Sequence, residues 1–473
     1  NGWCNTNYSG GYCSAQCGGS SDCPEGSECF PDPKGSQKMC WKKCETHWDC
    51  RADQFCADGV GICTPDCQID TCNSGYKCDN ITGQCVPIAS IDCEPVDEVC
   101  DDKDNDCDGV VDEGCGNALD PTEDTLVTDL GYVEAGGGGL SQTLSVDIST
   151  AAKSFMIIMT TADGSPDILS LWSLRSPSGE ELVIGSDPYG SPIRLSPDIG
   201  NCTVLVPNTP SVTLEGGKYK FSIYKDGDLG GVWVSVIQVI RPQVTQSKMD
   251  VNLWFTGLGS LNANKAKTNN KFQSLLNYFK ALLKEHGITV NKVAYYDVAN
   301  HLAQQYSIVD SSDEFGVDEH AEILALSESL PEDDRGVNFF FVKGFTGWGL
   351  LGKAGGIPGP PIHGTYSSGV VVSMADYFDS KFDNVVALTA HAMAHELGHQ
   401  LGLFHTSEQT GEMWDPLPDT PKCANDFNKD GMVDFQECIG KGNTNLMFWL
   451  AHLDNVLSND QKFVIHRNPT LYE

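Results

Sequence analysis

Three histidines in the last third of the chain have the spacing of metal ligands. They lie in the segment HELGHQLGLFH, at His395, His399 and His405. Residues four apart on a helix point the same way, so the first two imidazoles can bind one Zn²⁺. Gly402 has no Cβ, which lets the chain leave the helix in a left-handed conformation and bring His405 back as a third ligand. Three protein ligands leave a fourth position open for water, as in a catalytic zinc site.

Glu396 supplies the acid–base group that such a site needs. Its carboxylate is not a ligand, but it can reach a zinc-bound water and take its proton, as hydrolysis of an amide near neutral pH requires. A chance pattern on an amphipathic helix is the alternative, although the extended motif is far more restrictive than HExxH alone. His391 is one turn before His395, about 6 Å along the helix axis, so we expect it to pack and not to bind the ion.

The motif HExxHxxGxxH resembles that of the metzincin clan of zinc endopeptidases. In that clan a methionine-containing turn lies beneath the zinc, and the resemblance implies Met447, in NTNLMFWL, for this role; a core methionine is the alternative. Trp449 stands where several metzincin families have a tyrosine, and an indole has no ionisable hydroxyl to take over that role. The segments HTSE and DPLPDTP look most like the pappalysins, over at most the last third of the chain.

Composition limits the kinds of partner and the compartment. The 473 residues predict about three domains, and no apolar run is long enough to span a bilayer. A net charge of -35 argues against nucleic acid or an anionic membrane as partner. Of 21 cysteines, all but Cys202, Cys423 and Cys438 precede residue 116, which indicates a secreted, extracellular protein. Because Asn1 follows no signal peptide, we expect a processed form.

Residues 1–92 are expected to form small disulfide-rich modules, because this stretch has few apolar residues to bury. Three sets of four cysteines follow one another, each separated from the next by three residues. The sets are Cys17, Cys23, Cys29 and Cys40; Cys44, Cys50, Cys56 and Cys63; and Cys67, Cys72, Cys78 and Cys85. Cys4 and Cys13 remain as a separate pair. Each set allows three connectivities, which the sequence does not decide. Such modules usually serve as spacers or bind an extracellular partner.

Two acidic loops are candidate structural calcium sites. In residues 93–116, oxygen ligands alternate as in a calcium loop, although Cys115 replaces the final glutamate of an EF-hand. The candidate ligands there are Asp104, Asp106, Asp108 and Asp112. The second loop, DFNKDGMVDFQE, matches an EF-hand loop in full, and Cys423 and Cys438 on either side predict a disulfide. Its candidate ligands are Asp426, Asn428, Asp430, the carbonyl of Met432, Asp434 and Glu437. A merely solvated acidic turn is the alternative for the first loop.

The remaining segments must position the histidines. Short apolar or alternating runs between Gly, Pro, Asp and Asn in residues 117–245 predict an all-β sandwich or jelly roll as an accessory domain. Its Cys202 is either a buried free thiol or, as in metzincin zymogens, a group that blocks the zinc. Residues 246–473 are expected to form the α/β (α+β) metzincin-like domain. Its expected strands are 249–257, 288–298 and 338–345, and its helices are 269–287, one from about Asp383, and one after Ser458.

A multidomain secreted zinc endopeptidase is the function that these patterns favour. The resemblance implies that TYSSGVVVSM, residues 365–374, forms the strand at the upper edge of the cleft, to which an extended substrate adds by main-chain hydrogen bonds. One catalytic Zn²⁺ and one or two structural Ca²⁺ are the expected cofactors. Two alternatives remain: an extracellular calcium-binding structural or adhesion protein with a metzincin-derived scaffold, and a latent zymogen of the peptidase. The sequence does not decide the substrate.

Overall fold

The computed structural model describes most of the chain after residue 123 and short pieces before it. The described residues are 3–5, 12–14, 17–18, 20–24, 26–31, 38–43, 54–56, 63–65, 76–79, 84–87 and 124–473, without 136–138, 163, 228–229, 243–244, 259–260, 312–317, 332–333, 347–348 and 379–383. The calcium loop expected in residues 93–116, with Asp104, Asp106, Asp108 and Asp112, lies outside the described residues. The described parts of Gly114–Leu253, Asn270–Ala294 and Val309–Glu473 belong to one compact unit, which holds the candidate site.

Four two-stranded hairpins make up the described N-terminal residues. They are β1 (Trp3–Asn5) with β2 (Tyr12–Ser14), β3 (Ser27–Pro31) with β4 (Lys38–Lys42), β5 (Gln54–Cys56) with β6 (Cys63–Pro65), and β7 (Tyr76–Asp79) with β8 (Gln84–Pro87); η1 (Ser20–Asp22) precedes β3. Each hairpin sets two cysteines opposite each other: Cys4 and Cys13, Cys29 and Cys40, Cys56 and Cys63, and Cys78 and Cys85. In the first expected set of four, the disulfides are Cys17–Cys29 and Cys23–Cys40.

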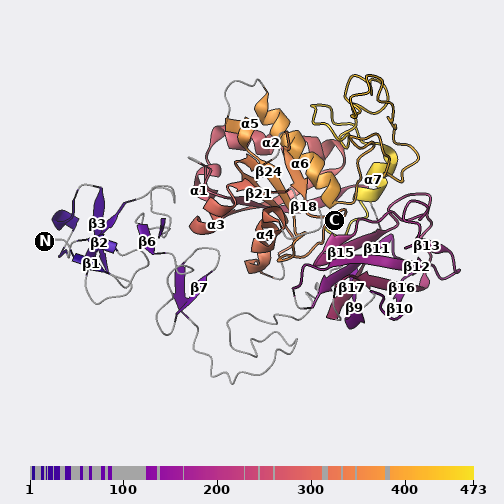
Figure 1. Ribbon diagram of the computed structural model, residues 1–473, viewed down its shortest axis with the longest axis horizontal. Coiled ribbons are helices and arrows are strands. Elements are labelled where there is room, and N and C mark those ends of the chain that lie inside the picture. Colours follow the sequence, from indigo (N-terminus) through magenta and orange to yellow (C-terminus); the bar gives the residue numbers. More distant parts are fainter. Residues whose placement is uncertain are drawn as a thin grey trace. The chain divides into compact units, whose positions relative to one another are not determined.

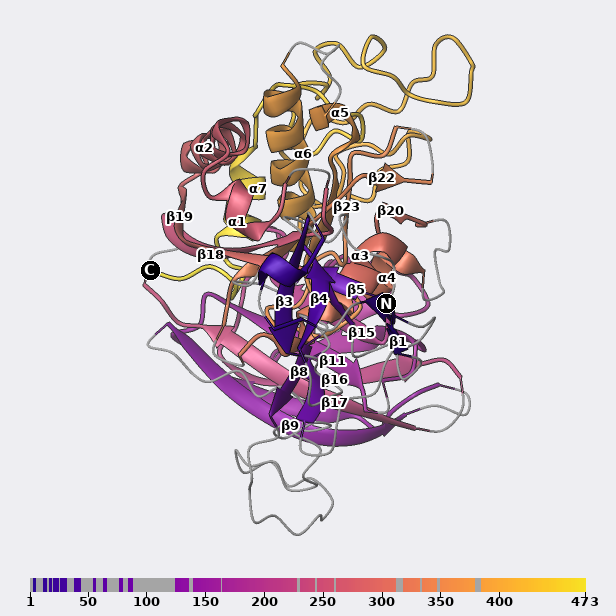
Figure 2. The ribbon, with the colours of Figure 1, turned by 90° about the vertical axis from the view of Figure 1, so that its left-hand side faces the viewer.

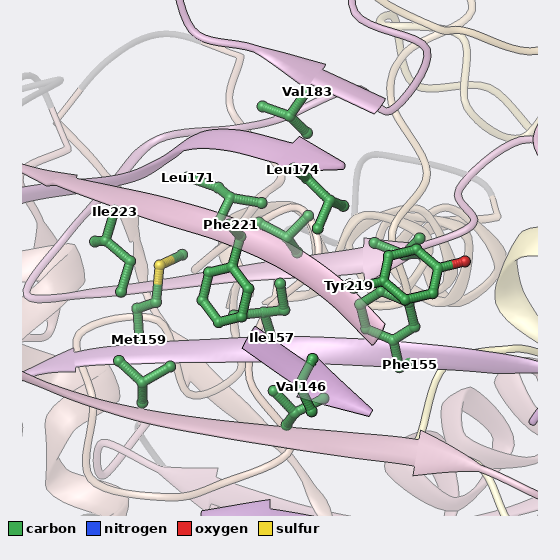
Figure 3. Close-up of a cluster of buried hydrophobic side chains, with 14 of the residues drawn as sticks. Val146, Phe155, Ile157, Met159, Leu171, Leu174, Val183, Tyr219, Phe221 and Ile223 are labelled. Atoms are coloured by element: carbon green, nitrogen blue, oxygen red, sulfur yellow. The ribbon is translucent and has the colours of Figure 1, made fainter. Parts of the chain in front are cut away.

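Two antiparallel sheets pack face to face in residues 125–239 (Figure 1). One sheet has the order β10 (Leu144–Ile148), β16 (Gly217–Lys225), β12 (Ile168–Arg175), β13 (Glu181–Ile184), with β14 (Asp198–Ile199) also paired to β12; the other has the order β15 (Asn201–Val206), β11 (Ser154–Thr161), β17 (Gly230–Val239), β9 (Thr125–Ala135). Figure 3 shows apolar side chains from both sheets meeting in a core, among them Phe155, Met159, Leu171 and Phe221. One face of each sheet turns its apolar side chains toward this core, and β11 and β15 are buried on both faces.

Seven of these strands coincide with the short apolar or alternating runs of the sequence, and β9 and β14 do not. The runs are residues 140–148, 154–161, 167–174, 181–185, 202–207, 218–225 and 231–240. The alternation in β9 is interrupted at Gly131, whose φ is +72°. At the same place the register with β17 shifts between Val234 and Ser235. A bulge of this kind moves the following side chains out of a strict two-residue period, which hides the strand from a search for alternation.

The candidate site is built on another five-stranded sheet, separate from the two sheets of the sandwich. Its order is β19 (Ile288–Asp297), β18 (Ser247–Phe255), β21 (Val337–Val342), β24 (Val370–Ser373), β23 (Gly352–Ala354). Strand β24 is parallel to β21 and antiparallel to β23. Helices α2 (Asn270–Glu285) and α6 (Val385–Gln400) pack against each other on this sheet (Figures 1 and 2). Helix α2 buries one apolar stripe, which includes Phe272, Leu276 and Phe279. This buried stripe explains why apolar residues recur with the period of a helix in this segment.

Shorter elements complete this part of the chain. They are α1 (Ala263–Ala266), α3 (Asn300–Gln305), β20 (Ile308–Val309), α4 (Glu319–Ala325), η3 (Leu326–Ser329), β22 (Gly344–Phe345), α5 (Ala375–Phe378) and α7 (Asn459–Ile465). Ser458 caps α7 through a capping box with Gln461, as the sequence predicted. Among the described helices, none combines the length and the apolarity that crossing a bilayer requires.

The edge strand of this sheet is not where the sequence placed it. Residues 370–373 form β24, which has neighbours on both sides, and the edge is β23, inside the glycine-rich stretch expected to be a loop. Gly352 explains the difference, because a Cβ at this position would lie 2.5 Å from Cγ of Glu396. A strand can therefore pass this close to α6 only with glycine at that point.

The loop between β23 and β24 is held on two sides. On the sandwich side, the hydroxyl of Thr203 donates to the carbonyl of Pro358, and Ser367 bonds the carboxylate of Asp198. On the other side, the N–H of Gly359 donates to the carbonyl of Gln400 at the end of α6, at 3.1 Å. The sandwich is therefore packed against the loop that leads from the edge strand into the sheet.

Candidate metal centre and cleft

Helix α6 and the turn after it position the three histidines. His395 and His399 lie in the last two turns of the helix, which ends at Gln400. Gly402 then adopts the left-handed conformation that the sequence predicted, with φ of +107°. The N–H of Gly402 donates to the carbonyl of His399 at 2.8 Å, and that of Leu403 to the carbonyl of Gly398 at 2.9 Å. This tight helix end returns the chain so that His405 faces the helix.

The three imidazoles converge through their Nε2 atoms. Nε2 of His405 lies 3.1 Å from Nε2 of His395 and 3.1 Å from Nε2 of His399. Each Nδ1 has a separate oxygen partner: the carbonyl of Leu446 at 2.7 Å for His395, the carbonyl of Leu403 at 2.6 Å for His399, and the carboxylate of Glu408 at 2.7 Å for His405.

These partners assign the protons of the rings. Carbonyl and carboxylate oxygens only accept, so each Nδ1 carries the hydrogen and each Nε2 presents a lone pair to the others. Burial, followed by the charge of His405, lowers the pKa of His395 to about 3 and that of His399 well below its usual range. His395 and His399 are therefore neutral, and the facing nitrogen lone pairs repel one another unless a cation lies between them. Three imidazole nitrogens with an open side suit zinc.

Glu396 lies beside the histidines in a buried position. It is 8% exposed, and burial raises the pKa of its carboxyl to about 8, while a hydrogen bond from the backbone of Ala354 acts in the opposite direction. A cation held by the neighbouring imidazoles would favour the ionised carboxylate. The backbone of Gly352 packs against this side chain and fixes its place next to the edge strand.

A cavity of about 400 Å³ opens onto these groups. His395, Glu396 and His405 line it together with the apolar side chains of Leu350 and Leu446. Further along, its walls come from Leu351, Ala392, Gln409, Trp449, Leu450 and His452. Two of the candidate ligands and the candidate base thus line one space that a ligand of peptide size can enter.

Met447 packs directly under the active-site helix. It is fully buried, and its carbonyl accepts from the N–H of Thr406 at 3.0 Å. A Cβ on Gly398 would lie 2.4 Å from its Sδ, so the sulfur rests on the backbone between His395 and His399. Met432, by contrast, is 41% exposed in the acidic loop. Met447 therefore packs against the helix backbone between His395 and His399, and its role as a methionine turn stays a prediction.

Gly398 is expected to be indispensable for this packing. In Gly398→Ala the added methyl group meets the buried Met447, and overpacking of this kind costs about 1–3 kcal/mol. Urea unfolding should show this loss of stability. Dialysis should show weaker retention of zinc, because the flanking ligands His395 and His399 both shift. The opposite result would be a gain of about 1 kcal/mol in the free energy of unfolding, as a glycine-to-alanine change gives in an exposed helix. That gain would mean that Met447 does not press on the helix.

Three further residues singled out in the sequence lie apart from the ligand set. His391 is buried, burial lowers its pKa to about 4, and neither ring nitrogen has a hydrogen-bond partner among the described residues. Trp449 donates its indole N–H to the carbonyl of Val433 at 2.7 Å. Cys202 is buried in the sandwich core as a free thiol and does not belong to the group formed by the three histidines.

The acidic loop after the site has its disulfide but no compact cluster of carboxylates. Cys423 and Cys438 are bonded, as expected. The carboxylate of Asp426 accepts the N–H groups of Lys429 and Gly431, and that of Glu437 accepts the N–H groups of Phe427, Asn428 and Asp434. Within the described part of the chain, only the three histidines and the disulfide-bonded Cys17, Cys23 and Cys29 bring three candidate ligand atoms within 4.8 Å of one another. Calcium in this loop stays a prediction.

Sequence reasoning missed the residues that orient the ligands. The partners of the Nδ1 atoms include two backbone carbonyls, which leave no trace in the residue types. Glu408 is different, because an acidic residue three positions after the last histidine is a detectable signal. A carboxylate on the far nitrogen of a metal-binding imidazole fixes its tautomer and raises its basicity. Gly352 and Gly398 were missed because their role depends on what packs against them.

Comparisons with known proteins add little to this geometry. No protein-family model matches the chain, and no curated protein matches it. Among solved structures, the chain is similar to archaemetzincin from Methanopyrus kandleri, with a TM-score of 0.24 and 17% identity over 36% of this chain and 82% of that one. It is also similar to metalloproteinase-II from Bacteroides fragilis, with a TM-score of 0.27 and 12% identity over 50% of this chain and 62% of that one. Because these scores are low, we argue function from the chain's own residues.

Proposed function

We propose that the chain is a zinc-dependent endopeptidase in which His395, His399 and His405 hold the metal and Glu396 is the general base. The observation that carries the proposal is that three Nε2 lone pairs converge next to a buried carboxylate. In each ring, an oxygen that accepts from Nδ1 fixes the orientation of the imidazole. A set of histidines with only a packing role has no reason to point three lone pairs at one another.

The chain's own groups divide the reaction between them. Bound zinc would supply Lewis-acid polarisation of a water and of the scissile carbonyl. Glu396 takes the proton from the attacking water and later delivers it to the nitrogen of the leaving amine. The carbonyls of Leu446 and Leu403 and the carboxylate of Glu408 keep the three rings oriented. The apolar walls of the cavity exclude bulk water around the carboxylate.

The edge strand supports cleavage within a chain over trimming of its ends. Strand β23 has β24 on one side and is the last strand of its sheet. Its Gly352 touches Glu396, so backbone groups on its free side run past the candidate base. An extended peptide can add to such an edge by main-chain hydrogen bonds, which places an internal peptide bond at the catalytic groups.

The same proposal covers the compartment and the accessory parts. Disulfides at Cys17–Cys29, Cys23–Cys40 and Cys423–Cys438 support secretion into an oxidising environment. We assign residues 1–92 and 117–245 to accessory domains and residues 246–473 to the peptidase. Structural Ca²⁺ is proposed for the loop from Asp426 to Glu437, whose residue types match an EF-hand loop.

Metal removal and return test the proposed function. Dialysis of the purified chain against a chelator should abolish casein cleavage, and zinc should restore it. Zinc should also raise the thermal midpoint, because a ligand at about 100 times its Kd adds about 2.7 kcal/mol of stability. A His405→Ala variant should lose both responses. Zinc-induced stabilisation without any cleavage would identify a scaffold and contradict the proposal.

A further inference from the structure

The segment closed by the Cys423–Cys438 disulfide contacts the wall of the cleft through Val433 and two neighbours: Met432 accepts from the amide of Gln409 at 2.6 Å, and the ring of Phe435 lies 6.2 Å from that of His452. This valine is fully buried in a small cluster with both half-cystines and Phe448, against which Trp449 and Leu450 pack. The cluster is separate from the sandwich core. It therefore depends on the disulfide and a few side chains for its stability.

The peptide groups of Val433 connect two parts of the cleft wall. Its N–H donates to the carbonyl of Gln409 at 2.9 Å. Its carbonyl accepts the indole N–H of Trp449 at 2.7 Å. Gln409 and Trp449 both line the cavity that contains Glu396, and they come from segments 40 positions apart in sequence. The peptide group of Val433 thus bonds both parts of the wall to the disulfide-closed segment.

The metal ligands do not depend on this segment for their orientation. Their Nδ1 partners are the carbonyls of Leu446 and Leu403 and the carboxylate of Glu408, all outside residues 423–438. One further contact comes close to them: the N–H of Cys423 donates to the hydroxyl of Ser407 at 2.8 Å. Loosening the segment therefore moves the substrate-binding wall more than the metal centre.

We infer that the segment from Cys423 to Cys438 is a positioning element for substrate binding, which acts through Val433 on Gln409 and Trp449. This inference rests on the proposed peptidase function. Its consequence is that substrate affinity depends on the redox state of the disulfide. When the disulfide is closed, the wall is ordered before the substrate binds. When the disulfide is reduced, part of the binding free energy is used to order the wall.

Two variants and a matched control test the inference on the full chain. Cys423→Ser/Cys438→Ser opens the segment, and Trp449→Phe removes the indole donor while keeping an aromatic ring. Cys17→Ser/Cys29→Ser removes a disulfide that lies outside the unit holding the site. On a casein-derived peptide we expect KM to rise about tenfold for the first variant and about threefold for the second, with kcat within about twofold. The control should match the parent, and zinc content should be equal in all.

Hydrogen exchange gives a readout that does not need activity. In the Cys423→Ser/Cys438→Ser variant, amides in residues 406–412 and 446–452 should exchange faster than in the parent, because local opening exposes them. Unchanged exchange there, or an unchanged KM in both variants, overturns the inference and leaves the proposed function standing. If the parent itself shows no chelator-sensitive cleavage, the proposed function fails, and the exchange result still decides whether the segment holds the wall.

Discussion

A Glu396→Gln variant should lose peptide cleavage by a factor on the order of 10²–10⁴ while keeping its zinc, since general acid–base catalysis contributes about that much. The amide has nearly the same size as the carboxylate and can keep the hydrogen bond from the backbone of Ala354. It cannot take a proton from water. Because Glu396 is buried and packs on Gly352, no solvent carboxylate can replace it at that place.

Steady-state cleavage of casein measures the loss of activity. Metal analysis of the same preparations measures whether the variant keeps its zinc. Glu181→Gln is a suitable control, because Glu181 lies in an exposed ion pair with Arg175 in the sandwich. Its activity should equal that of the parent. Retention of more than about a tenth of the activity by Glu396→Gln would place the base elsewhere. Loss of zinc together with activity would show that the carboxylate supports the metal and not the proton transfer.

Much of the site could be predicted because its chemistry is local in sequence. His395, Glu396 and His399 share one helix, and Gly402 and His405 follow within a few residues, so helical geometry and one left-handed residue bring them together. The contacts that orient these groups come from Leu446, far along the chain, and from backbone carbonyls that residue types do not reveal. The candidate zinc ligands were therefore recognisable from the sequence, whereas the hydrogen-bond acceptors on their Nδ1 atoms were not.

The fold was predictable from the sequence where one pattern of apolar residues continues along a whole helix or strand. Helix α2 keeps its apolar stripe, and strand β11 is a continuous buried run, so both appear in the sequence. The edge strand β23 has neither pattern. It is three residues long, and Gly352 is there because Glu396 packs against it. A glycine that is needed because two segments approach each other closely gives no periodic signal in the sequence. The edge of the cleft was therefore predicted at β24 and not at β23.

Stability of the C-terminal segment is expected to depend on Arg241, which is 1% exposed at the end of the sandwich. Its guanidinium donates to the carbonyl of His466 at 2.6 Å, to that of Asn468 at 3.4 Å, and to that of Leu471. These carbonyls follow helix α7, whose end leaves acceptors without partners in the helix. Burial lowers the pKa of Arg241 to about 10, so the side chain remains protonated at neutral pH and also complements the helix dipole.

Arg241→Met should therefore lower the free energy of unfolding by about 3 kcal/mol, since each hydrogen bond from a charged donor contributes about 1.5–3 kcal/mol and the desolvation of the arginine is recovered. The methionine fills a similar volume but removes the donor to the carbonyls of His466 and Leu471, whereas the carbonyl of Asn468 keeps the N–H of Leu471 at 3.2 Å. Urea unfolding followed by circular dichroism measures the change. Arg175→Met, which removes an exposed arginine from its pair with Glu181, should cost no more than about 0.5 kcal/mol. Equal losses in the two variants would mean that Arg241 does not anchor the segment after α7.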